Sequence, residues 1–232
     1  MTSVDNRLDD KNSEWFKDYS NDFRSHRKRQ FFSIFYQAGE IITNPEVKSV
    51  LEFGSGRNVT KALVEHFGIR HVSVDQNPNF ISDFNGDLGL FTSTETYDMV
   101  CAFQMLEHNP LEKIGGILEK FRDLSQKYVF ISVPFSGRSG SFSIQTNIAL
   151  LSFSLIRCFT WDRLRKIVRP TEKYQKLPPE KKYGPHWWEV GDKNFTLGDM
   201  NALLDRSGLK TVKRFHNEFY PYHLFYLLEK KV

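Results

Sequence analysis

Apolar segments that read as buried strands alternate with helical patterns along most of the chain, and this alternation restricts the fold more than any other feature. Strand patterns cover residues 47–53, 71–75, 97–103, 128–133, 209–217 and 222–229, and helical patterns cover 13–43, 58–67, 110–125 and 196–207. Such alternation is typical of a doubly wound, mostly parallel α/β sheet with helices on both faces.

Size and composition agree with a single folded domain. The chain has 232 residues and a net charge of +4, so its overall charge does not require a nucleic-acid partner. Its two cysteines, Cys101 and Cys158, form no disulfide framework and no metal-binding spacing, and Cys101 is expected to be a buried thiol. The N-terminus is polar and lacks the apolar core of a signal peptide, which predicts a cytoplasmic protein.

The segment "VLEFGSGRNVT" joins the first predicted strand to a helix through a glycine-rich turn. Gly54 and Gly56 allow a tight turn and a close approach of the backbone to a ligand. A dinucleotide fingerprint would need a third glycine at position 59, where the chain has Val59, and the Gly-Lys-Ser/Thr of a phosphate loop is absent. Glu52 beside this turn suits a ligand with positive or hydroxyl groups better than a pyrophosphate.

Polar residues follow the other predicted strands as well. Asp75 ends the second strand, Asp87 lies in "DFNGDLGLF", and the strand at 97–103 runs into "QMLEHNP". Ligands of doubly wound sheets bind beyond the carboxyl ends of the strands, so these residues are predicted to gather at one edge. Each also has a structural interpretation, because Asp75 and Asp87 could cap a helix or a turn. Glu107 and His108 are expected to cap and orient the next helix.

With these motifs, the chain resembles the class I S-adenosylmethionine-dependent methyltransferases of the small-molecule type that contain a Leu-Glu-His motif. The resemblance is close over residues 47–134 and rests on pattern alone over 195–230. It implies a Rossmann-like sheet of seven strands. It also divides the domain into an N-terminal helical cover (1–46), a cofactor-binding core (47–134), an inserted substrate cap (135–195) and a final helix with strands (196–232).

The resemblance further implies S-adenosyl-L-methionine as the cofactor and assigns residues to it. Gly54 and Gly56 would approach its methionine part, Asp75 would accept hydrogen bonds from the ribose hydroxyls, and Asp87 would bind the adenine amino group. The full set implied to bind the cofactor is Glu52, Gly54, Ser55, Gly56, Asp75, Gln76, Asp87, Leu88 and Gln104. The chain departs from the family at Asn58, where many members have a third glycine, but asparagine tolerates turn conformations well.

The acceptor side is predicted from "GPHWWEVGDKNFT". His186 and Glu189 are candidates for a general base and the residue that orients it, or for a hydrogen-bonded pair that holds the loop. Adjacent Trp187 and Trp188 cannot both face one side, so one is expected in the core and the other in a substrate pocket, together with His108. The sequence offers no convincing set of carboxylates for a metal-dependent methyltransferase, so no metal site is predicted.

The segment from 141 to 184 is basic, with nine Lys and Arg residues against three acidic ones. The apolar run "NIALLSFSLIRCF", which precedes most of these basic residues, is too short and interrupted to span a membrane. It is expected to form a helix that packs on the core with a solvated basic face. The alternative is a cap that contacts an anionic or lipid-linked substrate at a membrane surface. The N-terminal "RSHRKRQ" offers the same choice, with a solvated helix face preferred to a nucleic-acid patch.

The sequence therefore predicts methyl transfer to an oxygen or nitrogen of a small or carrier-linked metabolite. Three alternatives stay open. The first is methylation of RNA or protein through the basic segment. The second is a module that binds S-adenosylmethionine without turnover. The third, and the least favoured, is a dinucleotide oxidoreductase, because the third glycine of the dinucleotide fingerprint is missing.

Overall fold

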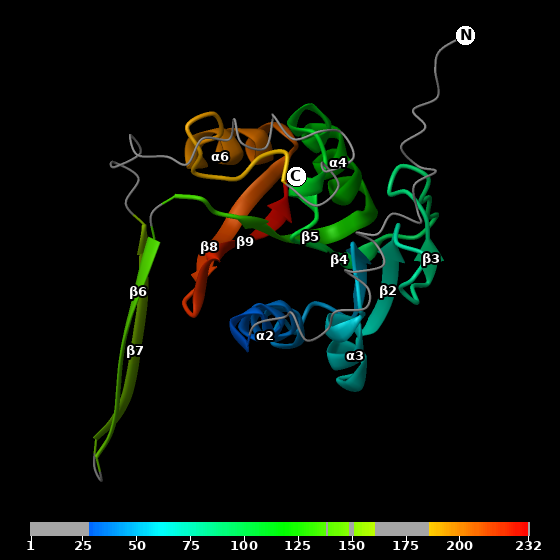
Figure 1. Cartoon of the computed structure of the whole chain (residues 1–232). Helices are drawn as coiled ribbons and strands as arrows, with labels where there is room; N and C mark the ends of the chain where they lie inside the picture. The colour runs from blue at the N-terminus through cyan, green and yellow to red at the C-terminus, as the bar shows by residue number, and fades with distance from the viewer. Residues whose placement is uncertain (1–27, 138, 149–150, 161–185, 232) are drawn as a thin grey trace.

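A computed structural model describes residues 28–137, 139–148, 151–160 and 186–231 of the chain (Figure 1). The first part of the predicted N-terminal helical region and most of the basic residues counted between 141 and 184 lie outside these residues. So does most of the N-terminal "RSHRKRQ" segment. The predictions made for them stay predictions.

The described core is a seven-stranded sheet in the order β3-β2-β1-β4-β5-β9-β8. The first five strands along the chain run parallel, whereas β9 pairs antiparallel with β5 and β8 pairs antiparallel with β9. The bounds of its strands are Ser49–Phe53 (β1), Arg70–Asp75 (β2), Phe84–Asn85 (β3), Tyr97–Phe103 (β4), Ser125–Pro134 (β5), Leu209–Asn217 (β8) and Tyr220–Lys230 (β9). The doubly wound fold predicted from the sequence is thus confirmed.

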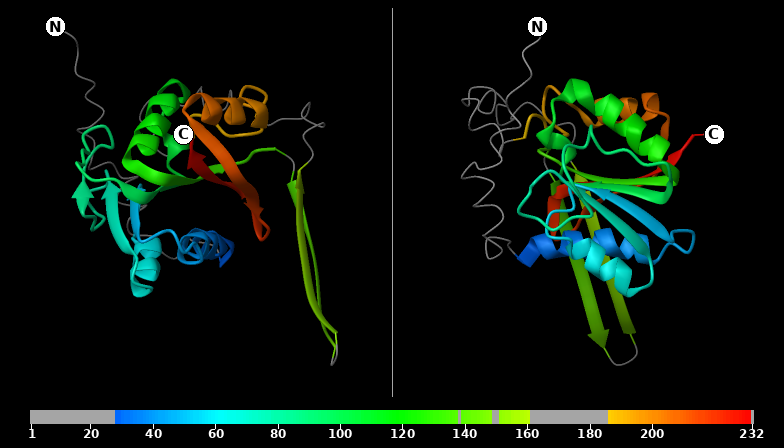
Figure 2. Two further views of the ribbon diagram at one scale, coloured as in Figure 1. Left: turned by 180° about the vertical axis from the view of Figure 1, so that it is seen from behind. Right: turned by 90° about the vertical axis from the view of Figure 1, so that its right-hand side faces the viewer.

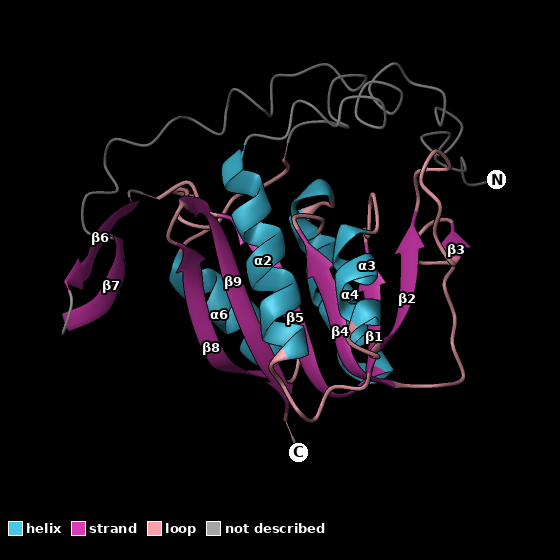
Figure 3. Cartoon of the chain, turned by 90° about the horizontal axis from the view of Figure 1, so that it is seen from below, coloured by secondary structure: helices cyan, strands magenta, loops and turns pink. Residues whose placement is uncertain are grey.

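Helices cover both faces of this sheet, as Figures 2 and 3 show. On one face lie α4 (Leu111–Leu124) and α6 (Leu197–Arg206), and on the other lie α2 (Lys28–Ile42) and α3 (Val59–His66). The central strands are buried on both sides because their apolar residues point alternately to the two layers. Leu51 and Phe53 of β1 join the core under α4 and α6, whereas Val50 joins the core with Ala38 of α2 and Val64 of α3.

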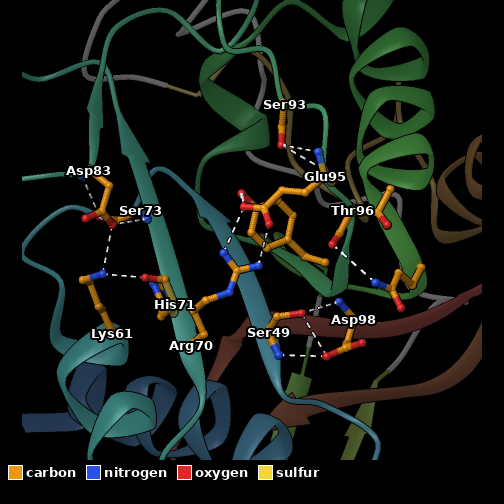
Figure 4. Close-up of polar contacts among 12 residues, drawn as sticks. Ser49, Lys61, Arg70, His71, Ser73, Asp83, Ser93, Glu95, Thr96 and Asp98 are labelled. Atoms are coloured by element: carbon orange, nitrogen blue, oxygen red, sulfur yellow. Dashed lines mark hydrogen bonds and ion pairs between the residues drawn. The ribbon is translucent and has the colours of Figure 1, made fainter.

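Polar side chains fix the register of the strands at the amino edge of the sheet (Figure 4). The carboxylate of Asp98 on β4 accepts hydrogen bonds from the backbone N–H groups of Lys48 and Ser49 at 2.9 and 2.8 Å. Arg70 at the start of β2 forms a bidentate pair with Glu95 at 2.9 and 3.1 Å. These contacts lie at the edge opposite the glycine turn, so they support the fold without entering the candidate site.

The helix predicted for "NIALLSFSLIRCF" is wrong. This run lies in a two-stranded antiparallel hairpin, β6 (Ser139–Ile148) and β7 (Leu151–Thr160), which projects from the body of the molecule in Figures 1 and 2. Short apolar runs do not distinguish helix from strand by period, and β-branched and aromatic residues favour the extended form. Among the described residues, none of the helices combines the length and the apolar character needed to cross a bilayer.

Candidate functional site

The glycine turn between β1 and α3 has the left-handed backbone that its sequence requires. Gly54 and Gly56 have φ angles of +74° and +54°. Asn58 also lies in the left-handed region, with φ 56° and ψ 30°, so the departure from the family pattern at this position keeps the turn intact. A Cβ atom built on Gly54 would lie 2.7 Å from Cγ of Met105, which shows how closely the backbone approaches the next loop.

Asp75 connects this turn to the end of β2. Its side chain is buried, one carboxylate oxygen accepts from the N–H of Gly56 at 2.7 Å, and the other accepts from the N–H of Asn77 at 2.8 Å. Burial raises the pKa of Asp75, and the two backbone hydrogen bonds oppose this only partly. Each carboxylate oxygen keeps a second acceptor position. Asp75 is therefore a buried acceptor at the carboxyl edge, and it holds the glycine turn in place rather than capping a helix.

Two polar atoms beside Asp75 lack a partner among the described residues. The hydroxyl of Ser55 and the side-chain nitrogen of Asn77 are buried and form no hydrogen bond. Leaving such groups unpaired costs about 1–3 kcal/mol each, so they mark a place where a polar ligand would be stabilised. Ser55 was predicted from the sequence as a cofactor residue, whereas Asn77 was missed, because its signal there was that of a turn residue.

The other predicted cofactor residues lie around the same edge. Asp87 accepts from the N–H of Gly89 at 2.6 Å, which confirms that it caps a turn, and Leu88 packs partly buried against the core. Gln76 is exposed after β2. Gln104 follows β4 with a φ of +52°, and its side-chain nitrogen donates to the hydroxyl of Ser132 at 3.2 Å. All four lie at or just beyond the carboxyl ends of the strands.

Glu52 differs from this group, because its side chain points into the protein. It is buried, and its carboxylate pairs with Nε2 of His71 on β2 at 2.9 Å. His71 is also buried. The described structure therefore gives Glu52 a partner on the neighbouring strand, and a direct contact with the cofactor stays a prediction.

A second group of polar residues begins just after β4, in the short 3₁₀ helix η3 (Leu106–His108). Glu107 is fully buried, and neither of its carboxylate oxygens has a hydrogen-bond partner among the described residues. Nδ1 of His108 is also buried and unpartnered. The prediction that these two residues cap the following helix is wrong: Pro110 is the N-cap of α4, and no side chain caps it.

The loop before α6 brings His186 to the same place from far along the chain. Nε2 of His186 lies 3.9 Å from a carboxylate oxygen of Glu107, and its Nδ1 lies 2.9 Å from a carboxylate oxygen of Glu189. The hydroxyl of Tyr222 on β9 donates to that same Glu189 oxygen at 2.6 Å. The backbone N–H of Trp187 donates to the carbonyl of Glu107 at 2.8 Å, which attaches this loop to η3.

These groups shift one another's ionisation. Burial raises the pKa of Glu107 to about 7, although the nearby His186 lowers it. Burial, together with the charge of His186, lowers the pKa of His108 to about 4. For His186, burial lowers the pKa, but the hydrogen bond to Glu189 and the two carboxylates outweigh it and leave the pKa above its usual value. Such mutual perturbation in one cluster is typical of functional sites.

The two tryptophans separate as expected. Trp188 is buried in the core, and its Nε1 donates to the carbonyl of Asn109 at 3.0 Å. Trp187 is 41% exposed, and whether it lines a substrate pocket stays a prediction. Tyr222 was not predicted as a site residue. Its place at the start of an antiparallel strand, and therefore at the carboxyl edge, was the one signal that could have identified it.

Comparison with known proteins identifies the fold of the chain. No protein-family model and no curated protein sequence matches the chain. Solved structures do match over nearly the full length: DhpI in complex with S-adenosylhomocysteine superposes with a TM-score of 0.59 at 13% identity, covering 98% of this chain and 99% of that one.

Two further solved structures match the chain at similar TM-scores and similarly low sequence identity. The N-methyltransferase NodS of Bradyrhizobium japonicum has a TM-score of 0.58 at 10% identity, covering 97% and 99% of the two chains. The 1,6-didemethyltoxoflavin-N1-methyltransferase of Burkholderia thailandensis also reaches 0.58 at 13% identity, covering 100% and 92%. The chain therefore has the Rossmann-like fold of the small-molecule methyltransferases that use S-adenosylmethionine.

Proposed function

We propose that the protein binds S-adenosyl-L-methionine at the carboxyl edge of β1 and β2 and transfers its methyl group to an oxygen or nitrogen of a small or carrier-linked metabolite. One observation carries this proposal. Asp75 is buried against the glycine turn, with the unpartnered Ser55 hydroxyl and Asn77 amide beside it. These acceptors and donors match a ligand that presents ribose hydroxyls and an amino acid group, and there is no phosphate-binding glycine pattern for a dinucleotide.

The residues of this edge have distinct tasks in the proposal. Asp75 would accept from the ribose hydroxyls, Gly54 and Gly56 would leave room for the methionine part, and Asp87 with Leu88 would contact the adenine. Bound there, the cofactor supplies an electrophilic methyl group. The reaction is an in-line displacement, so orienting the acceptor beside that methyl group would supply much of the rate.

The acceptor would lie toward the group of polar residues around Glu107 and His186, which is joined to the glycine turn through Met105. Gly54 packs against Met105, and Met105 directly precedes η3 with Glu107 and His108. His186, oriented by Glu189, would accept a proton if the acceptor must lose one. Several neighbours are named as enzymes that act on small molecules, which favours such an acceptor over RNA or protein.

The first prediction tests cofactor binding. Titration calorimetry should show binding of S-adenosylmethionine or S-adenosylhomocysteine, and Asp75→Ala should weaken it by about 1–3 kcal/mol, or about 5- to 150-fold in Kd, because charge-assisted hydrogen bonds are lost. Asp98→Ala is the matched control, since it also removes a carboxylate that holds two backbone N–H groups, but at the opposite edge of the sheet. It should lower the melting temperature and leave cofactor affinity unchanged.

Binding of NAD in place of S-adenosylmethionine would overturn the proposal. Formation of S-adenosylhomocysteine from labelled cofactor in a metabolite extract would separate an enzyme from a module that only binds. A salt-sensitive shift of RNA on a gel, without turnover of any extracted metabolite, would favour the nucleic-acid alternative.

A further inference from the structure

Glu107, His108 and His186 form a cluster of side chains of the types that bind metals, and the sequence does not predict it. Each residue offers one ligand atom, and the three atoms lie within 4.8 Å of one another. Glu107 is fully buried with both carboxylate oxygens unpartnered, and His108 has a buried, unpartnered Nδ1. A buried carboxylate is costly unless it is paired or coordinates a metal, so the cluster lacks a partner that a cation would provide.

The hydrogen bonds around His186 select the atom that would bind. A carboxylate only accepts hydrogen bonds, so the 2.9 Å contact between Glu189 and Nδ1 of His186 places the ring hydrogen on Nδ1. In the neutral ring the lone pair is then on Nε2, which faces a Glu107 oxygen at 3.9 Å; a proton on Nε2 and a metal ion are the two ways to place positive charge between these atoms. Two acceptors facing each other at this distance repel unless a positive charge lies between them.

Glu189 and Tyr222 complete the pattern from the outside. Histidines that bind metals usually donate their other N–H to a carboxylate, which fixes the tautomer and orients the ring. Glu189 does this for His186, and Tyr222 holds Glu189 in turn by donating a hydrogen bond of 2.6 Å. The supporting residues of a metal site are thus in place beside the candidate ligands.

The spacing is close to what coordination requires. Bonds of about 2.0–2.1 Å in a tetrahedral site put neighbouring ligand atoms about 3.3 Å apart. The Glu107–His186 pair, at 3.9 Å, needs a closure of about half an ångström, and since no pair in the cluster exceeds 4.8 Å, the largest closure required is about 1.5 Å, which side-chain rotation supplies. Imidazole nitrogens suit first-row transition metals rather than Mg²⁺, and two histidines with one carboxylate leave at least one coordination position open.

We propose that Glu107, His108 and His186 bind a divalent transition-metal ion, with Zn²⁺ as the reference ion, and that Glu189 and Tyr222 orient the His186 ligand. Metal binding itself does not depend on methyl transfer. One extension rests on the proposed function: at the open position, the ion would bind an acceptor hydroxyl and lower its pKa, which would favour an oxygen acceptor. His186 would then act as a metal ligand in place of the proton acceptor named above.

The test is metal binding by the full chain, without cofactor or acceptor. Protein stripped with a chelator and passed through a desalting column is titrated with Zn²⁺ by calorimetry and with Co²⁺ by visible absorbance. We expect one site per chain with a Co²⁺ spectrum of nitrogen and oxygen ligands, and no competition from excess Mg²⁺. Glu107→Gln should abolish the site, and Glu189→Gln should weaken it about 10- to 100-fold.

Two controls make the result decisive. His66→Ala removes an exposed histidine at the end of α3 and should leave Zn²⁺ binding unchanged. Glu107→Gln replaces a buried charge with a neutral group of the same shape, so its metal-free melting temperature should equal or exceed that of the wild type. Equal Zn²⁺ affinity of wild type and Glu107→Gln overturns the proposal, and so does a wild type that binds no Zn²⁺, which would leave Glu107 as a partner of protonated His186 only.

Discussion

Gly54→Val should abolish cofactor binding while the far-ultraviolet circular-dichroism spectrum stays that of the folded protein. Gly54 has a φ of +74°, which costs a side-chain-bearing residue about 1–2 kcal/mol and a β-branched one more. Its new Cβ would also lie 2.7 and 2.9 Å from Cγ and Cβ of Met105. The turn and the loop of Met105 must then move apart, which displaces both sides of the proposed cofactor site. Calorimetry with S-adenosylhomocysteine measures the loss.

Gly68→Val separates the local clash from the general strain of the left-handed backbone. Gly68 has a φ of +78° at the end of α3, and a Cβ there would meet no atom within 4 Å. This control should lose stability to a similar backbone strain and keep its cofactor affinity. Unchanged affinity in Gly54→Val would show that this turn does not hold the ligand.

His186→Ala should lower turnover by about 10²–10⁴-fold, the usual contribution of a positioned proton acceptor, once an acceptor has been identified. Its cofactor affinity should stay constant, because the polar and ring contacts of His186 are with Glu107, His108, Glu189 and Tyr222, which lie outside the glycine turn. S-adenosylhomocysteine formation measures turnover, and calorimetry measures affinity.

The same variant distinguishes a proton acceptor from a residue that only anchors the loop. An anchor would lower the melting temperature together with the rate, whereas a catalytic group would lower the rate alone. Chelator treatment of the wild type adds a second distinction, because it stops a metal-assisted reaction and leaves a metal-free base unaffected. Full rate and normal stability in His186→Ala would contradict both roles.

The sequence predicted the sheet well because buried parallel strands are apolar throughout and end abruptly in polar residues. The buried parallel strand at 97–103 was predicted to the residue, and so was the antiparallel edge strand at 209–217, most of which is exposed. The predicted edge of the sheet, with Asp75 after β2 and the glycine turn after β1, is also where the structure has it. In both cases, the information lies within a few consecutive residues.

The predictions that were wrong or missing concern features that depend on contacts between distant segments. Glu107 and His108 read as a helix cap, since nothing in "QMLEHNP" reveals that His186 approaches from a later loop. The β6–β7 hairpin failed for another reason, because its apolar run fits helix and strand equally and only cross-strand pairing decides. Tyr222 was missed because its role follows from the direction of β9.

The antiparallel direction of β9 has a consequence for the order of assembly. His223 pairs with Pro134, so the beginning of β9 lies at the carboxyl end of β5, and Tyr222 reaches Glu189 only from there. Glycine turn, Asp75 and η3 all precede β5 in the chain, and neighbouring strands can pair locally as they emerge from the ribosome. The cluster of Glu107, His186, Glu189 and Tyr222 instead forms only after a long loop has closed. The lost chain entropy makes that step slow. A nascent chain would thus form the glycine turn with Asp75 first and bring Tyr222 to Glu189 only when β9 inserts.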